Sequence, residues 1–471
     1  MYQRALLIYP PTGLYDRYDR CQSPVEEEAV KVIRAPLDLL YIAATLEQVG
    51  VECRIRDYPA LQQKWENFKA DLKDFNPDML VISVVTPTLV KDMEAAVIAK
   101  NIKPDILTIV KGAYFSDRAR EVMEAYKGLD IAIRGEYEFA VQEVAKGAPL
   151  NSVLGITFRE NGAIKETADR PLLEDLDLLP FPARHLIDNS RYLMPGTEEP
   201  MATIMTGKGC PCQCVYCLAP LVSGRKLHLR KPGRIVDELA ECVKRHNIHT
   251  FWFRSDTFTM RKDWVIELCQ GILDRGLKIK WATNSRVDTI DLERLQWMKQ
   301  AGCFVVGYGI ESGNQEILDK MKKGITLEQA RRAVALTKQA GLEVFAFFIV
   351  GMPWENRKAV FDTIRFAKEL DADLYNFSVA YPFPETELYA ISRKLNLLDE
   401  ECIFDAHYAK PALGTMFLSK KEVKTLANRA YIATLLRPRY IFKKMVRLKS
   451  PVVISRYIKA GFTLFKNLLR A

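Results

Sequence analysis

The sequence of 471 residues lacks any apolar run of the roughly 18 residues that a helix needs to cross a membrane. Its beginning, MYQRALLIYPPTG, has a short apolar run without a small-residue cleavage site, so we expect no secretory signal and a cytoplasmic location. Histidine is scarce: the chain has five, and all of them follow residue 184. The part of the chain before that residue therefore has no imidazole to offer a metal.

Acidic residues are scarce at the other end of the chain. Between Phe417 and Ala471 there are fourteen Lys or Arg residues and one acid, Glu422, so this segment carries +13 while the whole chain carries +9. Such a segment suits anionic lipid, nucleic acid or an acidic partner. Residues 451–471 predict an amphipathic helix with a basic face. We favour docking of this helix on the body, with contact to a membrane as the alternative.

Ten cysteines are many for a reducing compartment, and four of them fall within eight residues, at Cys210, Cys212, Cys214 and Cys217. Structural zinc usually takes two cysteine pairs well apart in sequence, and no second pair follows here. Three thiolates spaced C-x3-C-x2-C, on Cys210, Cys214 and Cys217, can ligate three irons of a [4Fe–4S] cluster and leave the fourth iron open. We favour this open cluster with Cys212 as a bystander; a closed site of all four cysteines is the alternative.

The chain alternates strand and helix patterns twice, which indicates an α/β protein. Residues 1–147 predict a doubly wound parallel sheet, whose ligand loops follow the carboxyl ends of its strands. Residues 148–200 are rich in Pro and loop-like, apart from a hairpin in GITFRENGAIKE, and predict a connector. Residues 201–385 predict a partial (β/α)6 barrel with the cysteines on its first loop, and residues 386–471 a helical, basic C-terminal region.

The cysteine segment GKGCPCQCVYCLAP resembles the radical S-adenosylmethionine (SAM) superfamily, with the aromatic Tyr216 just before the last cysteine. Later stretches, FRSDTFT, WATNSRVDTI, AGCFVVGYGIESGNQEILDKMKKGIT and AGLEVFAFFIVGMPWEN, resemble the cobalamin-binding branch of class B methyltransferases and oxidative cyclases. Together with the N-terminal sheet, the resemblance covers about residues 1–390. It implies a cobalamin-binding Rossmann-like domain followed by a radical SAM barrel, and three cofactors: a [4Fe–4S] cluster, SAM and cobalamin.

Several barrel residues become candidates through this resemblance, because they follow strands whose ends face the site. The expected SAM-binding residues are Tyr216, Arg286, Glu311, Ser312 and Gly351. The expected catalytic residues are Asp256, Tyr308 and Tyr381. Each has a structural alternative: Glu311 can be a charge at a helix start, Gly351 a turn, and Arg286 a partner of Asp288.

In the N-terminal domain, PPTGLY, PDMLVISVVTPT and RGEYEFAVQEV match the usual layout of the cobalamin domain. The candidate cobalamin contacts are Pro11, Gly13, Ser83, Thr86, Thr88, Gly112, Tyr114, Gly135 and Glu136. The threonines can instead cap a helix. Lys111-Gly112-Ala113-Tyr114 stands where relatives often have Gly-Gly-x-His, so the lower face of cobalt would meet Tyr114, water or nothing. The alternative is a sheet that has lost cobalamin and only supports the barrel.

The resemblance implies methylation of an unactivated carbon through a 5′-deoxyadenosyl radical and methylcobalamin. A ring-forming or rearranging reaction is the alternative, and a non-catalytic sensor a further one. We expect a small-molecule or lipid-like substrate, such as an isoprenoid or a tetrapyrrole, and an electron donor of the flavodoxin or ferredoxin type. The basic tail would allow peripheral contact with the inner face of the membrane. The C-terminal tail shows no clear helix-turn-helix pattern, which disfavours the sensor, and we expect no nucleic-acid partner.

Overall fold

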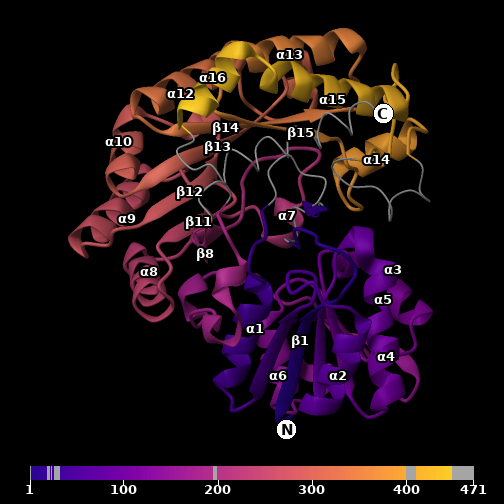
Figure 1. Cartoon of the computed structure of the whole chain (residues 1–471). Coiled ribbons are helices and arrows are strands. Elements are labelled where there is room, and N and C mark those ends of the chain that lie inside the picture. Colours follow the sequence, from indigo (N-terminus) through magenta and orange to yellow (C-terminus); the bar gives the residue numbers. More distant parts are fainter. Residues whose placement is uncertain are drawn as a thin grey trace. The chain divides into compact units, whose positions relative to one another are not determined.

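The computed structural model describes residues 2–17, 22, 24–25, 32–194, 199–398 and 410–447. Contacts between residues divide the chain into two compact units, which we describe separately (Figure 1). The first unit comprises Met1–Glu26, Val32–Tyr192 and Leu221–Ser223, and the second comprises Glu27–Lys31, Leu193–Pro220 and Gly224–Ala471.

The first unit is a twisted sheet with helices on both faces. Its strands are β1 (Arg4–Tyr9), β2 (Glu52–Asp57), β3 (Met79–Ser83), β4 (Leu107–Lys111), β5 (Ile131–Ile133), β6 (Ile156–Glu160) and β7 (Ala163–Glu166), in the order β2-β1-β3-β4-β5-β6-β7. The first five are parallel, as the pattern of strands and helices predicts. Every residue of β3 is buried, as expected for a strand covered on both faces.

Two apolar cores hold the helices against this sheet. The helices are α1 (Leu37–Glu47), α2 (Trp65–Phe75), α3 (Leu89–Asp92), α4 (Glu94–Ile102), α5 (Phe115–Ala125) and α6 (Glu138–Ala145). Helices α1 and α6 pack on one face, and α2, α4 and α5 pack on the other (Figure 1). The doubly wound architecture predicted from the sequence is therefore confirmed.

The predicted connector, residues 148–200, is placed differently. The expected hairpin forms as β6 and β7, but β6 also pairs antiparallel with β5. Ile156 and Phe158 are buried in the same core as α1 and α6. Because these contacts tie the hairpin to the sheet, the first compact unit runs on to Tyr192. The other predicted domain boundaries stay predictions.

The second unit contains a six-stranded parallel sheet whose neighbours follow chain order. Its strands are β8 (Met201–Met205), β11 (Thr250–Arg254), β12 (Lys280–Ser285), β13 (Cys303–Glu311), β14 (Glu343–Val350) and β15 (Leu374–Val379). In the described ranges β8 does not pair with β15, so the barrel is open. This is the partial barrel that the sequence predicts.

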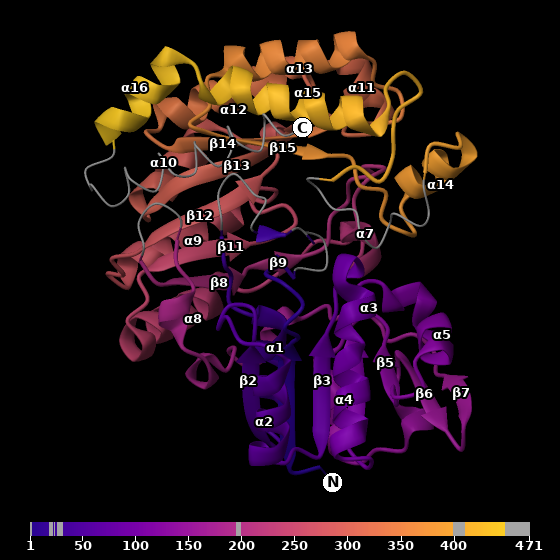
Figure 2. The ribbon, with the colours of Figure 1, turned by 45° about the vertical axis from the view of Figure 1, so that its right-hand side comes forward.

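Helices cover the outer side of this curved sheet (Figure 2). They are α8 (Pro232–His246), α9 (Lys262–Asp274), α10 (Leu292–Gln300), α11 (Gln315–Lys320), α12 (Leu327–Gln339) and α13 (Arg357–Leu370). The alternation along β14 shows the two sides of the sheet: Val344, Ala346, Phe348 and Val350 are buried in the outer core, while the residues between them are half-buried on the inner side.

The C-terminal region is helical, as predicted, with α14 (Glu387–Lys394), α15 (Lys420–Leu435) and α16 (Pro438–Arg447). Helix α15 packs on the edge strand β15, where the Tyr431 hydroxyl accepts a hydrogen bond from the Phe377 amide (3.0 Å) and donates one to Asn376 Oδ1 (2.5 Å). The amphipathic helix predicted for residues 451–471 lies outside the described residues. Among those that are described, no helix has the length and hydropathy for a membrane span.

A buried polar cluster joins the strand ends of the first unit to α1. The Asp38 carboxylate accepts hydrogen bonds from Tyr9 (2.6 Å) and Ser83 (2.7 Å) and forms an ion pair with Lys111 (2.6 Å). These partners end β1, β3 and β4. Burial raises the pKa of Asp38, but the Lys111 charge and the hydrogen bonds from Lys111, Tyr9 and Ser83 outweigh it, so the pKa lies below its ordinary value.

We predict that Asp38→Asn destabilises the first unit by about 3 kcal/mol at neutral pH, because it leaves the Lys111 ammonium buried without its counter-ion. Because the pKa is lowered, the contribution of Asp38 is present at neutral pH and is lost only as the pH falls through that pKa. Urea unfolding followed by circular dichroism measures the change. Asp105→Asn, at an exposed position, is the control and should change stability by less than about 0.5 kcal/mol. Equal effects of the two variants would contradict the prediction.

Candidate active site

The cysteine loop follows β8 and is fixed by its own backbone. The amide of Cys210 donates to Gly224 O (3.0 Å), the amide of Val215 to Met321 O (3.1 Å), and Val215 O accepts from the Leu388 amide (2.8 Å). Short elements flank the loop: β9 (Gly207–Lys208), β10 (His228–Leu229) and α7 (Ala219–Val222). The loop is therefore held at the carboxyl end of the sheet before any ligand binds.

The donor set fits an iron–sulfur cluster. All eight described cysteines are free; Cys210 is buried, and Cys212, Cys214 and Cys217 are half-buried. Within the described ranges, no three His, Cys, Asp or Glu side chains converge closely enough for one metal ion. A cluster has a different requirement, because each thiolate ligates a separate iron. The thiols of Cys210, Cys214 and Cys217 fit the open cluster that the sequence predicts, and the closed site of all four cysteines stays the alternative.

The role of Cys212 stays a prediction. Its thiol shares a hydrogen bond with that of Cys210, so the two sulfurs are neighbours. Its carbonyl accepts from Arg225 (3.4 Å).

A buried group of charged and polar side chains lies beside the cysteine loop. Lys323 Nζ is 2.8 Å from Glu311 Oε1 and donates to the Tyr216 hydroxyl at 3.3 Å. The Tyr216 hydroxyl also hydrogen-bonds to Glu311. Burial and the charge of Glu311 raise the pKa of Tyr216 well above its usual value, so the hydroxyl stays protonated. Two predicted SAM-binding residues, Tyr216 and Glu311, are thus brought together.

Arg286 contacts this group through the backbone carbonyl of Lys323. Its Nη2 donates to Lys323 O (3.0 Å), and its Nε and Nη2 contact both carboxylate oxygens of Asp288 (2.9 and 2.8 Å). The structural alternative for Arg286, pairing with Asp288, is therefore present. Its place next to Lys323 keeps it within the candidate site.

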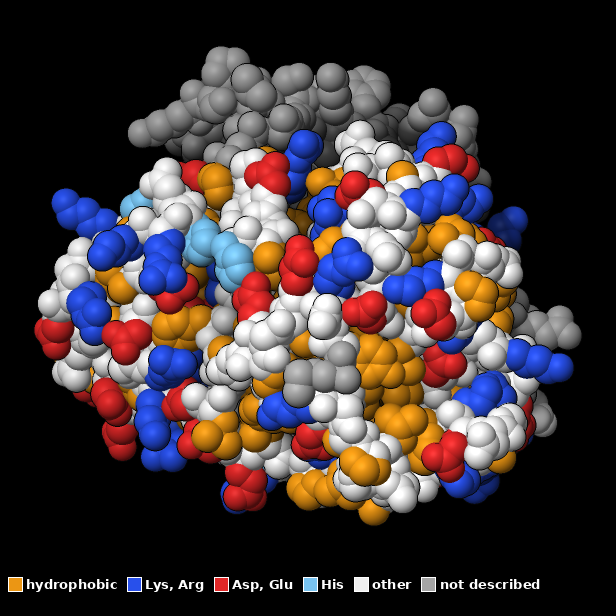
Figure 3. Space-filling model, turned by 90° about the horizontal axis from the view of Figure 1, so that it is seen from below, with side chains coloured by type: hydrophobic (Ala, Val, Ile, Leu, Met, Phe, Trp, Pro, Cys, Tyr) orange, Lys and Arg blue, Asp and Glu red, His pale blue; other side chains and the backbone are white. Residues whose placement is uncertain are grey.

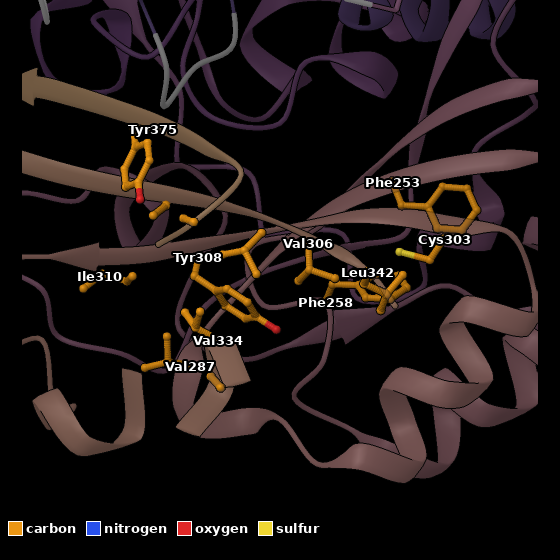
Figure 4. Packing of buried hydrophobic residues seen from close by; sticks show 14 of the residues in the cluster. Phe253, Phe258, Val287, Cys303, Val306, Tyr308, Ile310, Val334, Leu342 and Tyr375 are labelled. Carbon is orange, nitrogen blue, oxygen red and sulfur yellow. The ribbon is translucent and has the colours of Figure 1, made fainter. Parts of the chain in front are cut away.

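Two candidates on β13 and just after it face other partners. The Tyr308 side chain is fully buried and points from the sheet toward α12, where its hydroxyl lies 2.7 Å from Thr337 Oγ1 (Figure 4). The Ser312 hydroxyl is also fully buried and contacts Thr363 of α13 (3.1 Å). Both side chains thus lie in the outer core, on the side of the sheet that the helices cover, and their predicted roles stay predictions that this placement does not support.

Gly351 ends β14 in a left-handed conformation (φ +97°), and a Cβ there would lie 2.6 Å from Val423 Cγ1. Its amide donates to Glu355 Oε2 (2.6 Å), as does that of Met352 (3.0 Å). Burial raises the pKa of Glu355 to about 7, despite these two hydrogen bonds. The Gly351 amide is therefore engaged by the turn, and the role of Gly351 in binding SAM stays a prediction.

Asp256 and Tyr381 both lie near the cysteine loop. Asp256 Oδ2 accepts a hydrogen bond from the Gly209 amide (2.6 Å), directly before Cys210. Tyr381 is buried in a cluster with Leu218, and its ring contacts Phe383 at 4.5 Å between centroids. Both stay proposed catalytic residues.

The candidates of the first unit divide into buried and reachable ones. Ser83 donates to Asp38, Thr88 donates to Asp92 (2.6 Å), and the Thr86 amide donates to Gln22. These side chains and Glu136 are buried. The hydroxyls of Ser83 and Thr88 are engaged in the unit's own polar network, so their role as cobalamin contacts stays a prediction that these bonds do not support. Pro11, Gly13, Tyr114 and Gly135 are half-buried or exposed.

The glycines after β4 and β5 serve two purposes. A Cβ at Gly112 would lie 2.3 Å from Val84 O, so this glycine allows two backbones to meet. Gly135 (φ +78°) has no atom within 4 Å of a Cβ position and leaves its backbone open. These loops at the carboxyl ends of parallel strands fit a ligand that is held by backbone groups.

The described part of the first unit contains one histidine, His185. Its Nε2 lies 2.8 Å from Glu47 Oε1, at the last residue of α1. Because α1 runs back from the carboxyl end of β1, this histidine lies at the opposite edge of the sheet. Cobalt at the strand ends would therefore have no histidine ligand from this unit, as the sequence predicts.

Sequence reasoning missed many buried charged residues, among them Arg17, Lys111, Lys323 and Glu355. Arg17 donates to Asp92 Oδ2 (2.9 Å) and Ser83 O (3.1 Å), which fixes the loop after β1. The available signal for Lys323 and Glu355 was their position in the motifs KMKKGIT and GMPWEN. A charged letter in a loop is usually exposed, so nothing marked these as buried.

Comparison with known proteins agrees with this arrangement. The family model for the radical SAM superfamily matches residues 204–367, and that for the B12 binding domain matches residues 29–145. The first match contains the cysteine loop, and the second contains most of the sheet of the first unit.

Two curated relatives align over most of the chain. An uncharacterized methyltransferase of Pyrococcus horikoshii is 31% identical, over 93% of this chain and 94% of the relative. The anaerobic magnesium-protoporphyrin IX monomethyl ester cyclase of Cereibacter sphaeroides is 26% identical, over 82% of this chain and 64% of that protein.

The fold resembles the solved structure of the cobalamin-dependent SAM radical enzyme OxsB with aqua-cobalamin and SAM bound. The TM-score is 0.74 at 16% identity, covering 98% of this chain and 72% of that one. Three findings identify the family. They are the two family models, the 31% identical relative, and the order of a B12 binding domain before a barrel with three cysteines. The chain belongs to the radical SAM superfamily, in the branch whose members also carry a B12 binding domain.

Proposed function

We propose that this protein methylates an unactivated carbon of a small-molecule or lipid-like substrate. The observation that carries the proposal is the three-cysteine loop at the carboxyl end of an open parallel barrel, beside the buried group of Glu311, Lys323, Tyr216 and Arg286. The 31% identical relative is a methyltransferase, which favours methylation. Ring formation is the second candidate, because the 26% identical relative is a cyclase.

The chain's own residues divide the work between its two units. In the barrel, Cys210, Cys214 and Cys217 would hold the [4Fe–4S] cluster, which with SAM supplies a hydrogen-abstracting radical when both are bound. Tyr216, Glu311 and Arg286 would orient SAM, and the half-buried Asp256 is within reach of the loop through Gly209. Water is kept from this group by burial: the side chains of Lys323 and Glu311 are 8% and 9% exposed.

In the first unit, the loops at Pro11, Gly13, Tyr114 and Gly135 would hold cobalamin, which supplies a carrier for the methyl group when bound. The hydrogen bonds that Asp38 and Asp92 accept at the end of β3 and just after it keep these loops in place. Histidine ligation from this unit is not part of the proposal.

The C-terminal region supports peripheral contact with an anionic membrane. Ile441 and Phe442 of α16 are exposed by 42% and 69%, close to the exposed Arg439 of the same helix. Apolar and basic groups on one short helix suit an anionic lipid surface. By contrast, acidic and basic side chains are interspersed over the face in Figure 3, which gives that face no broad charge of one sign. An electron donor of the flavodoxin or ferredoxin type completes the proposal.

We predict that the anaerobically reconstituted protein transfers the label of methyl-deuterated SAM to a product. Protein loaded with cobalamin is incubated with a small-molecule and lipid extract, and mass spectrometry follows the label, S-adenosylhomocysteine and 5′-deoxyadenosine. If the protein is a methyltransferase, the labelled product, S-adenosylhomocysteine and 5′-deoxyadenosine should all form only with cobalamin bound. Cys214→Ala should form none of the three. Formation of 5′-deoxyadenosine alone would favour the ring-forming alternative and contradict methylation.

A second prediction concerns the cysteine loop. Cys212→Ala should retain the iron content of the reconstituted protein, while Cys214→Ala should lose most of it, because a cube cannot form stably on two thiolates. Iron and sulfide analysis with electron paramagnetic resonance of the reduced protein measures this. Equal loss in both variants would indicate the four-cysteine site and overturn the three-cysteine assignment.

A third prediction concerns the membrane. The double variant Ile441→Ser and Phe442→Ser should sediment several-fold less with anionic vesicles at low salt, because two exposed apolar groups are lost from the interface. Leu178→Ser, at another exposed leucine (62%), is the matched control. A deletion of residues 450–471 tests the predicted tail helix in the same assay. Unchanged sedimentation of the double variant and the deletion would exclude membrane contact through this region.

A further inference from the structure

Lys323 is the least expected charged group of the barrel, because it is buried although its neighbour in the sequence, Lys322, is exposed. Lys322 is exposed (49%) and pairs with Glu387 on the surface, whereas Lys323 is 8% exposed and pairs with Glu311. Taking two charges out of water is costly, and a buried ion pair often stabilises a protein no more than apolar side chains would. Stability alone therefore does not account for this lysine.

The backbone of Glu311 is arranged to make the pair. Glu311 has φ +70°, a left-handed conformation that is costly for a residue with a side chain, and the pairing of β13 with β14 shifts register between Gly309 and Glu311. A register shift of this kind turns a side chain away from its regular direction and is frequent next to active sites. Glu311 is thereby turned back over its own strand.

Gly309 provides the space for this contact. A Cβ at Gly309 would lie 2.4 Å from Glu311 Oε1 and 2.9 Å from Lys323 Nζ. The carboxylate and the ammonium thus occupy the volume that any other residue at 309 would fill. Three features of the chain, a strained residue, a register shift and a glycine, serve one ion pair.

Lys323 also reaches the cysteine loop. Its Nζ donates to the hydroxyl of Tyr216, which lies between Cys214 and Cys217, and its carbonyl accepts from Arg286. Lysine has three donors on one flexible stem, so a single ammonium can contact two acceptors on different segments. Here it connects the end of β13 with the loop after β8.

We propose that Lys323 is a positioning residue that fixes the Glu311 carboxylate and the Tyr216 hydroxyl for SAM. The inference rests on the proposed SAM site and adds a residue to it. Lys323 acts through Glu311 and Tyr216 and does not itself contact the reacting atoms. Without its ammonium, Glu311 loses its counter-ion and the constraint on its strained backbone, and the two SAM-facing groups no longer share one anchor.

The test is the dissociation constant of SAM, measured by equilibrium dialysis on reconstituted protein. Lys323→Met should raise it about tenfold or more, the usual effect of losing a residue that orients a ligand's contacts, with iron content unchanged. Lys322→Met is the matched control and should leave it unchanged. Because Lys323 acts partly through Glu311, Lys323→Met combined with Glu311→Gln should weaken binding by less than the product of the two single effects.

Either of two results would overturn the proposal: SAM binding by Lys323→Met equal to that of Lys322→Met, or effects of Lys323→Met and Glu311→Gln that multiply fully. If Lys323→Met does not fold, Gly309→Ala probes the same contact, with Gly233→Ala, at an open position, as its control. Gly309→Ala should then weaken SAM binding, and equal binding by both glycine variants would overturn the proposal. If the parent protein binds no SAM, the proposed function fails before this inference is reached.

Discussion

Parallel pairing of the six barrel strands is the constraint on which the site depends. Because all six run in one direction, the loop after β8 and the ends of β11, β12, β13, β14 and β15 arrive at one edge. Cys210, Asp256, Arg286, Glu311, Gly351 and Tyr381 are spread over 172 residues of sequence and share that edge only for this reason. The first unit applies the same rule to its own loops after β1, β3, β4 and β5.

Ion pairs lie behind these edges in both units. In the first unit Asp38 with Lys111 and Asp92 with Arg17 hold the strand ends and the loop after β1. In the second, Glu311 with Lys323 and Asp288 with Arg286 surround the segment that carries Tyr216. An unpaired charge at these depths would cost several kcal/mol, so the geometry of each pair is tightly specified. The result is a rigid polar support for ligands.

The spacing of apolar residues predicted the layers of the fold, because it shows whether one face or both faces of a strand are buried. Cysteine spacing and the later motifs predicted the family, which the family models confirm. The direction of single side chains could not be predicted. Tyr308 and Glu311 are three residues apart on β13 and lie on opposite sides of the sheet, but the alternation alone does not state which of the two sides the helices cover.

The hydrogen-bond partners of single polar groups in the buried networks could not be predicted either. Ser83 and Thr88 were expected to meet a ligand because they follow a strand, yet their hydroxyls are used by Asp38 and Asp92. The hairpin of β6 and β7 was read as part of a connector, because its composition is loop-like and only its pairing with β5 reveals its place. Both cases have one source: a sequence states which groups exist and leaves open which of them satisfy one another.

The contact of Tyr431 with β15 has a consequence for the size of the barrel. β15 is the last strand of the sheet, and the free amides of such an edge can recruit another strand. The Tyr431 hydroxyl occupies the Phe377 amide and the neighbouring Asn376 side chain, so a side chain of α15 stands where a seventh strand would begin its hydrogen bonds. In the part of the chain that the structure describes, a helix thus ends the sheet at six strands and covers part of an edge that could otherwise pair with a second molecule.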